Sequence, residues 1–87
     1  MKTYIISYDL RKVRDYKDLH DAIKSYGTWA HVLKSLWVVH SNSSAKEIRE
    51  KLLYYMDSDD GIFVVKSGGE AAWRNVISNN EWLKKYL

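Results

Sequence analysis

The sequence predicts a small α/β domain with the element order β-α-β-β-α-β. Strand-forming residues occur in four short runs, and two segments with helical spacing lie between the first and second runs and between the third and fourth. Turn-forming residues separate the segments. This is the order of the ferredoxin-like fold, a four-stranded antiparallel sheet with two helices on one face. Eighty-seven residues suffice for one domain, so we expect residues 1–87 to form a single domain with a core at 2–67 and a short helical extension at 70–87.

The first strand and the first helix follow from spacing and end signals. Residues 3–8 alternate in side-chain direction and are rich in β-branched and aromatic types, which is typical of a strand. A helix is expected over 16–26, because apolar residues recur there at helical spacing. Asp15 is a suitable N-cap, and Gly27 stands where a helix C′ glycine belongs.

The next two strands and the second helix are predicted from the same kinds of signal. Strands are expected at 28–33 and 36–41, with a tight connection at the polar pair between them; a single bent strand is the alternative. Ser44 and Glu47 form a capping box for a helix that ends near Met56. Its expected buried residues are Ala45, Ile48, Leu52 and Tyr55.

The chain then returns to the sheet and continues into the extension. A final core strand is expected at 62–67. Beyond it, a short helix is expected near 71–77, and Asn80 is expected to cap a last helical turn. The extension contains Trp73 and Trp82, so we expect it to dock on its own domain or on a partner.

The alternation in the strands leaves apolar residues on both faces of the sheet. In the last strand, Ile62 and Val64 oppose Phe63 and Val65. Two helices can cover one face, so the second face must be covered by the extension or by another subunit. The four Trp and seven Tyr also suggest burial against a second copy, although filling a small core explains them equally well. We therefore expect a homodimer.

Composition limits the environment and the partners. Without cysteine, the chain has no disulfide or thiolate metal site, which fits a cytoplasmic protein. No signal peptide is expected, and no apolar run of the sequence is long enough to span a membrane. The net charge of +3 is compatible with a phosphate-bearing partner but too small to require one.

One carboxylate lies beside a group of cations. Asp9 ends the first strand, and Arg11, Lys12, Arg14 and Lys17 follow it. This arrangement suits a metal-assisted phosphodiester site, with the carboxylate on Mg²⁺ or Mn²⁺ and the cations on the nucleic-acid backbone. The competing interpretation is that Asp9 starts a turn and the cations form a solvated loop.

Other polar residues give weaker signals. His20, His31 and His40 lie in different predicted elements without metal-binding spacing, so no role is expected for them. The acidic segment 57–60 is too short for a calcium loop and is expected to be a solvated turn. No Ser-His-Asp or Cys-His arrangement is recognisable.

Two short motifs carry a family resemblance. The strand ending Tyr8-Asp9-Leu10 resembles the Tyr-Asp-Ile/Leu signature of Cas-two, the small CRISPR-associated protein of spacer acquisition. The segment 32–37, Val-Leu-Lys-Ser-Leu-Trp, is similar to that family's Val-Gln-x-Ser-Val-Phe. The likeness covers roughly residues 3–67. It is greatest for the stand-alone branch named the SinR family, and VapD-type ribonuclease toxins share the architecture.

The resemblance implies roles for particular residues. Family members are homodimers in which the first-strand aspartates face each other and hold one divalent metal, which implies that role for Asp9 and a Mg²⁺ or Mn²⁺ ion shared across the dimer. Ser35 corresponds to the family's serine near that cleft, and Arg11 or Arg14 to its loop arginines. Leu33 replaces the family's glutamine, and the extension lacks the family's C-terminal strand.

Two hypotheses follow for function. The first is a homodimeric, metal-dependent endonuclease, with RNA preferred to DNA as its substrate, in which Asp9 and Ser35 are catalytic. The second is a non-catalytic dimeric module that binds nucleic acid or a protein partner. Neither requires a membrane or a small-molecule cofactor.

Overall fold

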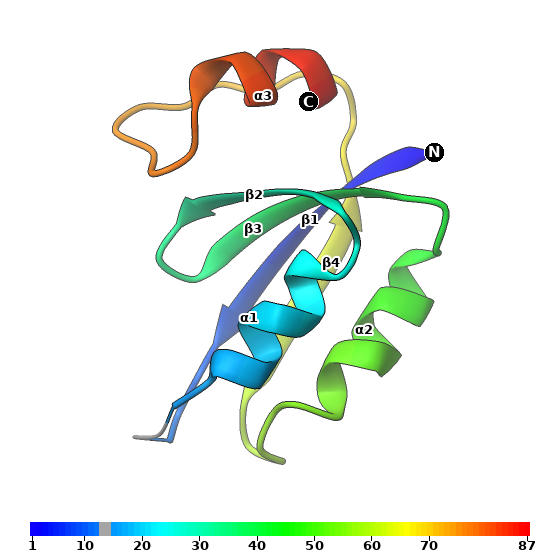
Figure 1. Cartoon of the computed structure of the whole chain (residues 1–87), viewed down its shortest axis with the longest axis vertical. Helices are drawn as coiled ribbons and strands as arrows, with labels where there is room; N and C mark the ends of the chain where they lie inside the picture. Colours follow the sequence, from blue (N-terminus) through cyan, green and yellow to red (C-terminus); the bar gives the residue numbers. More distant parts are fainter. Residues whose placement is uncertain (13–14) are drawn as a thin grey trace.

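The computed structural model describes residues 1–12 and 15–87 and has a small α+β architecture (Figure 1). Its described elements are β1 (Lys2–Asp9), α1 (Lys17–Lys24), β2 (Thr28–Leu33), β3 (Leu36–Ser41), α2 (Ala45–Leu53), β4 (Gly61–Lys66) and α3 (Asn80–Tyr86). The four strands form one antiparallel sheet in the order β2-β3-β1-β4. The expected four strands and first two helices are thus confirmed, and β2 and β3 are separate strands.

Helices α1 and α2 lie on the same face of the sheet (Figure 1). Ile6 of β1 is fully buried there beneath Leu19 and Ile23 of α1 and Ile48 and Leu52 of α2. Each such side chain contributes about 1.5–3 kcal/mol by leaving water. This core fixes the position of α1 over the end of β1.

The two helix starts differ in how well the sequence predicted them. The capping box of α2 is confirmed, because the Ser44 hydroxyl accepts from the Glu47 amide and the Glu47 carboxylate accepts from the Ser44 amide. For α1 the N-cap is Tyr16, so the assignment of Asp15 was wrong by one residue. The Asp15 carboxylate still accepts from the Lys17 amide at 2.9 Å.

Both helices end earlier than expected. The last turn after α2 uses tighter bonds, such as the Tyr55 amide to the Leu52 carbonyl at 3.0 Å, and Tyr55 points outward. Its predicted burial was wrong. After α1, Gly27 takes φ of 87°, a left-handed conformation that glycine adopts without strain. It lies two residues beyond the C-cap Ser25.

The extension crosses the opposite face of the sheet. No helix forms over 71–77, where Asn75 has φ of 56°, so that expectation was wrong. The helix α3 follows, and its N-cap is Asn79 instead of Asn80. Fully buried Leu83 packs on β2 and β3, while Trp73 and Trp82 are half-buried beside it. The expectation that the extension docks on its own domain is therefore confirmed.

The extension protects one edge of the sheet and leaves the other edge uncovered. The Ile77 amide donates to the Val32 carbonyl of the edge strand β2 at 2.8 Å. In the described chain, β4 pairs with β1 on one side and has no strand on the other. Because it pairs on one side alone, β4 is an edge strand instead of the expected core strand, and its Phe63 and Val65 are 65% and 39% exposed.

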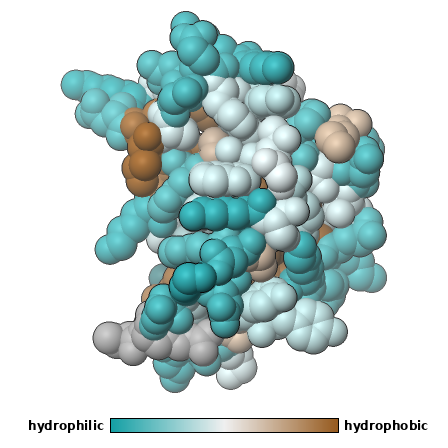
Figure 2. All heavy atoms as spheres, in the orientation of Figure 1, coloured by the Kyte–Doolittle hydropathy of each residue, from teal (hydrophilic) through white to brown (hydrophobic). Residues whose placement is uncertain are grey.

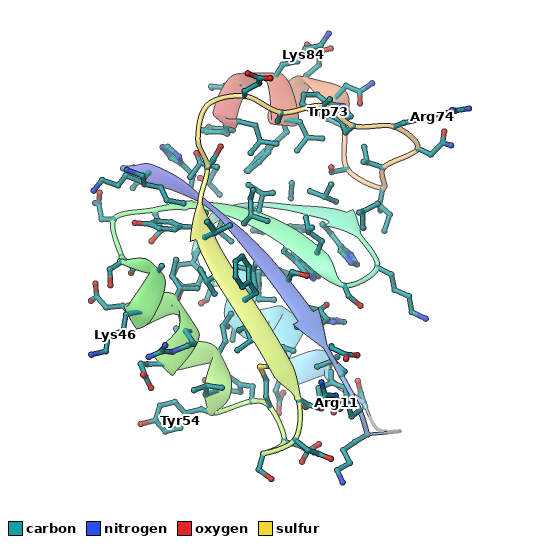
Figure 3. All side chains as sticks on the ribbon, turned by 180° about the vertical axis from the view of Figure 1, so that it is seen from behind. Arg11, Lys46, Tyr54, Trp73, Arg74 and Lys84 are labelled. Atoms are coloured by element: carbon teal, nitrogen blue, oxygen red, sulfur yellow. The ribbon has the colours of Figure 1, made fainter. Side chains whose placement is uncertain are left out.

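The outer surfaces of the two faces differ. In Figure 2 the face that carries α1 and α2 is largely hydrophilic, and apolar side chains appear in small separate patches. In the view from behind, α3 and the extension lie over one end of the sheet and leave β4 uncovered (Figure 3). None of the described helices combines the length and apolar character that crossing a membrane requires.

Candidate active site

A pocket of about 480 Å³ lies where β1 ends, beside the start of α1 and the turn between β2 and β3. It brings together Asp9 and Ser35, the two residues that the sequence predicted as catalytic. The Tyr8 amide donates to the Ser35 carbonyl at 3.0 Å, which fixes the turn against the strand. The pocket is lined by Tyr8, Asp9, Leu10, Asp15, Tyr16, His20, His31, Lys34 and Ser35.

Asp9 lies at the solvent-facing rim of this pocket. Its side chain is 73% exposed, and its Oδ2 accepts from Nε and Nη2 of Arg11, both at 3.4 Å. Such long contacts between exposed groups contribute little, about 0–1 kcal/mol. The carboxylate can therefore exchange this partner for a metal ion without a large cost.

Three of the four cations predicted to bind nucleic acid form ion pairs, and the fourth lies outside the described residues. Arg11 contacts Asp9, Lys12 lies 3.3 Å from Asp59, and Lys17 lies 2.6 Å from Asp21. Figure 3 shows Arg11 at the end of the sheet where β1 finishes. Arg14 lies outside the described residues. The pairs are exposed and weak, so their cations can still reach a phosphate, but each has a carboxylate as competitor.

The acidic segment 57–60 is more than a solvated turn. The Tyr16 hydroxyl lies 3.1 Å from Asp57 Oδ2 and 2.9 Å from Asp60 Oδ2. Asp60 also accepts from the Arg11 amide at 2.7 Å through its other oxygen. The segment therefore holds the start of α1 and the loop after β1 in place, which the sequence reading missed because the contacts join residues far apart in the chain.

Tyr8, which lines the pocket, belongs to a partly buried hydrogen-bond network. Trp37, 2% exposed, donates its Nε1–H to the Tyr8 hydroxyl at 2.9 Å. That hydroxyl lies 3.3 Å from His20 Nε2 and 3.5 Å from the Lys34 carbonyl. Burial raises the pKa of Tyr8, and the hydrogen bond from Trp37 acts in the opposite direction.

His31 lines the same pocket as His20, and both rings contact Trp37. The His31 ring stacks on Trp37 with centroids 4.0 Å apart and planes 6° apart. The His20 and His31 centroids are 6.2 Å apart. Burial lowers the pKa of His20, and the nearby His31 and Lys24 lower it further. Sequence reasoning missed this pair, because α1 and β2 meet only in the folded chain.

Neither comparison with known proteins nor the possible metal ligands identify a family for this chain. No known family model matches the chain, and no solved structure matches it. Among residues 1–12 and 15–87, no group of three or more His, Cys, Asp or Glu side chains is placed to hold a metal.

Proposed function

We propose that this chain is a homodimeric endonuclease of the Cas-two-like type, with RNA as its substrate. The observation that carries the proposal is the shared pocket of Asp9 and Ser35 at the end of β1, with Arg11 at its edge. Carboxylate and cation side by side suit a phosphodiester, since one can hold a metal and the other a phosphate oxygen.

The fold proposal is part of the same inference. We assign the ferredoxin-like topology to the element order and the strand order β2-β3-β1-β4, with α1 and α2 on one face. The resemblance in the segments Tyr8-Asp9-Leu10 and 32–37 supports the assignment, because these segments form the end of β1 and the turn between β2 and β3. The extension differs from the family's pattern, since it ends in the helix α3.

The dimer would form through β4. Phe63 and Val65 expose apolar surface beside an unpaired strand edge, and both features favour contact with a second chain. Light scattering should give about twice 10.3 kDa. Phe63→Asp should give monomers, whereas Ile77→Asp, with a comparable 63% exposure on the extension, should not. A wild-type monomer would contradict the dimer and the shared metal site.

The donor set at Asp9 fits Mg²⁺ or Mn²⁺. Mg²⁺ in phosphoryl-transfer sites is held by one or two carboxylates together with substrate phosphates and waters. Two copies of Asp9 across the dimer would provide those carboxylates. When bound, the ion would stabilise negative charge that develops on the phosphate. Arg11 and Lys12 would position the strand, and Ser35 lies close enough in the pocket to orient it.

Metal dependence of cleavage tests this proposal. Mg²⁺ or Mn²⁺ should raise the melting temperature of the wild type, because the ion binds the folded dimer. Asp9→Asn should lose most of that rise and the metal-dependent cleavage of RNA, and it should keep the dimer. Asp18→Asn, an exposed carboxylate in the first turn of α1, is the matched control and should behave as the wild type. Equal metal-dependent cleavage by Asp9→Asn would contradict the role of Asp9.

The pairing of the cations favours a second candidate, a non-catalytic dimeric module. Arg11, Lys12 and Lys17 each contact a carboxylate, which reduces their attraction for phosphate. In that case the uncovered β4 surface would be the functional feature. Purified protein that cuts neither RNA nor DNA with either metal would favour this candidate.

A further inference from the structure

Hydrogen bonding defines the protonation of His31 in the pocket. Its Nε2 lies 3.1 Å from the Lys34 carbonyl, which can only accept a hydrogen bond. Nε2 must therefore carry the hydrogen, and in the neutral ring Nδ1 is left with a free lone pair. In the described part of the chain, this Nδ1 has no hydrogen-bond partner. His31 is thus prepared to accept a proton from a bound molecule.

His20 can be satisfied in either protonation state, because the Tyr8 hydroxyl can turn. When His20 is neutral, Tyr8 can donate to its Nε2 at 3.3 Å. When His20 is protonated, Nε2 can donate to Tyr8, whose own hydrogen can turn to the Lys34 carbonyl at 3.5 Å. Trp37 donates to the same hydroxyl in both states. Tyr8 is therefore a positioning residue for a ring that can give up a proton from Nδ1.

The two rings are close enough to serve one phosphodiester. Their centroids are 6.2 Å apart, on one pocket of about 480 Å³. Small-ligand pockets occupy roughly 300–1,000 Å³. A phosphate that accepts hydrogen bonds of about 2.8 Å can contact both rings at this separation. Lys34, at the rim of the same pocket, adds a positive charge beside such a phosphate.

We propose that His31 and His20 act as general base and general acid in a metal-independent cleavage of RNA. His31 Nδ1 takes the proton of the ribose 2′-hydroxyl, the 2′-oxygen forms a bond to phosphorus, and the bond from phosphorus to the 5′-oxygen breaks. His20, protonated on both ring nitrogens, gives its Nδ1 proton to that leaving oxygen and becomes neutral. The products are a 2′,3′-cyclic phosphate and a 5′-hydroxyl. The inference takes RNA from the proposed function and needs neither Asp9 nor a divalent ion.

The test uses the full chain and a single-stranded RNA oligonucleotide in EDTA. The wild type should cut it and leave cyclic phosphate ends, and an all-deoxy oligonucleotide of the same sequence should remain intact. His20→Gln and His31→Phe should each lose about 10²-fold or more in rate. Phe at position 31 keeps the stacking on Trp37 while removing both nitrogens. Added imidazole should restore part of the rate of His20→Gln.

His40→Gln is the matched control. His40 contacts Thr3 and Tyr86 away from the pocket, and its replacement should leave the rate unchanged. Three results would each overturn the histidine pair: no cleavage in EDTA, products with 5′-phosphate ends, or an equal loss of rate in His40→Gln. Cleavage that requires Mg²⁺ and Asp9 and stops in EDTA would support the proposed function while refuting this pair. Cleavage that persists in EDTA and is lost in His20→Gln and His31→Phe would support the pair independently of the metal site.

Discussion

Replacing Leu83 by alanine tests whether the C-terminal extension is part of the folded core. Leu83 is fully buried between α3 and the strands β2 and β3. Leu→Ala substitutions at such sites cost about 2–5 kcal/mol, because transfer free energy is lost and a cavity remains. A protein of this size has roughly 4–13 kcal/mol of stability, so the change removes a large share of it. We expect a loss of about 3 kcal/mol, which lowers the melting temperature by roughly 12–24 °C.

Thermal and urea unfolding followed by circular dichroism would measure this loss. Lys84→Ala is the control, since the next residue on the same helix is exposed and its replacement should change stability by less than about 0.5 kcal/mol. Fluorescence of Trp73 and Trp82 in the extension would show whether it detaches before the sheet unfolds. If Leu83→Ala has the same melting temperature as Lys84→Ala, the docking of the extension is not a source of stability.

Three further predictions concern single contacts. Tyr8→Phe should cost about 1–3 kcal/mol in urea unfolding, because the buried Nε1–H of Trp37 loses its acceptor; unchanged stability would contradict that bond. Ser44→Ala should cost about 1 kcal/mol through loss of the α2 cap, and Ser44→Asp should recover most of it; equal stability of the two variants would contradict the cap. His20 has a folded-state pKa below its usual value of about 6.5, so its contribution to stability is complete above that pH and is lost as pH falls through the folded-state pKa. In His20→Gln the fall in stability between about pH 7 and pH 5 should therefore be shallower, and an equal slope would show that His20 is as easily protonated in the folded chain as in the unfolded one.

Local signals in the sequence were sufficient for most of the elements. The capping pair Ser44 and Glu47 and the strand alternation of residues 3–8 act within a few residues, so they can be read without the fold. The segment 71–77 was wrongly predicted to be a helix, because the spacing of its apolar residues does not reveal its contacts with a distant part of the chain. There, the Ile77 amide bonds to β2, a partner that lies far away in the sequence.

The candidate site, too, could be predicted from the sequence only in part. The family resemblance predicted that Asp9 and Ser35 belong to one site, and the structure places them in one pocket. His20 and His31 could not be predicted in this way, because their proximity depends on how α1 packs over β2 and on Trp37, which both rings contact. A histidine has no local spacing signal when its partner comes from another element.

The unequal edges of the sheet bear on how far assembly can proceed. A sheet with two open edges can add chains at both ends and grow into a filament. Here the bond from Ile77 to Val32 occupies the β2 edge, and among residues 1–12 and 15–87 the β4 edge is the one that stays open. If two chains pair β4 with β4 about a twofold axis, each chain uses its open strand edge, and the assembly stops at the dimer. Loss of the bond from Ile77 to Val32 would open the second edge, and chains would then add at both ends of the sheet.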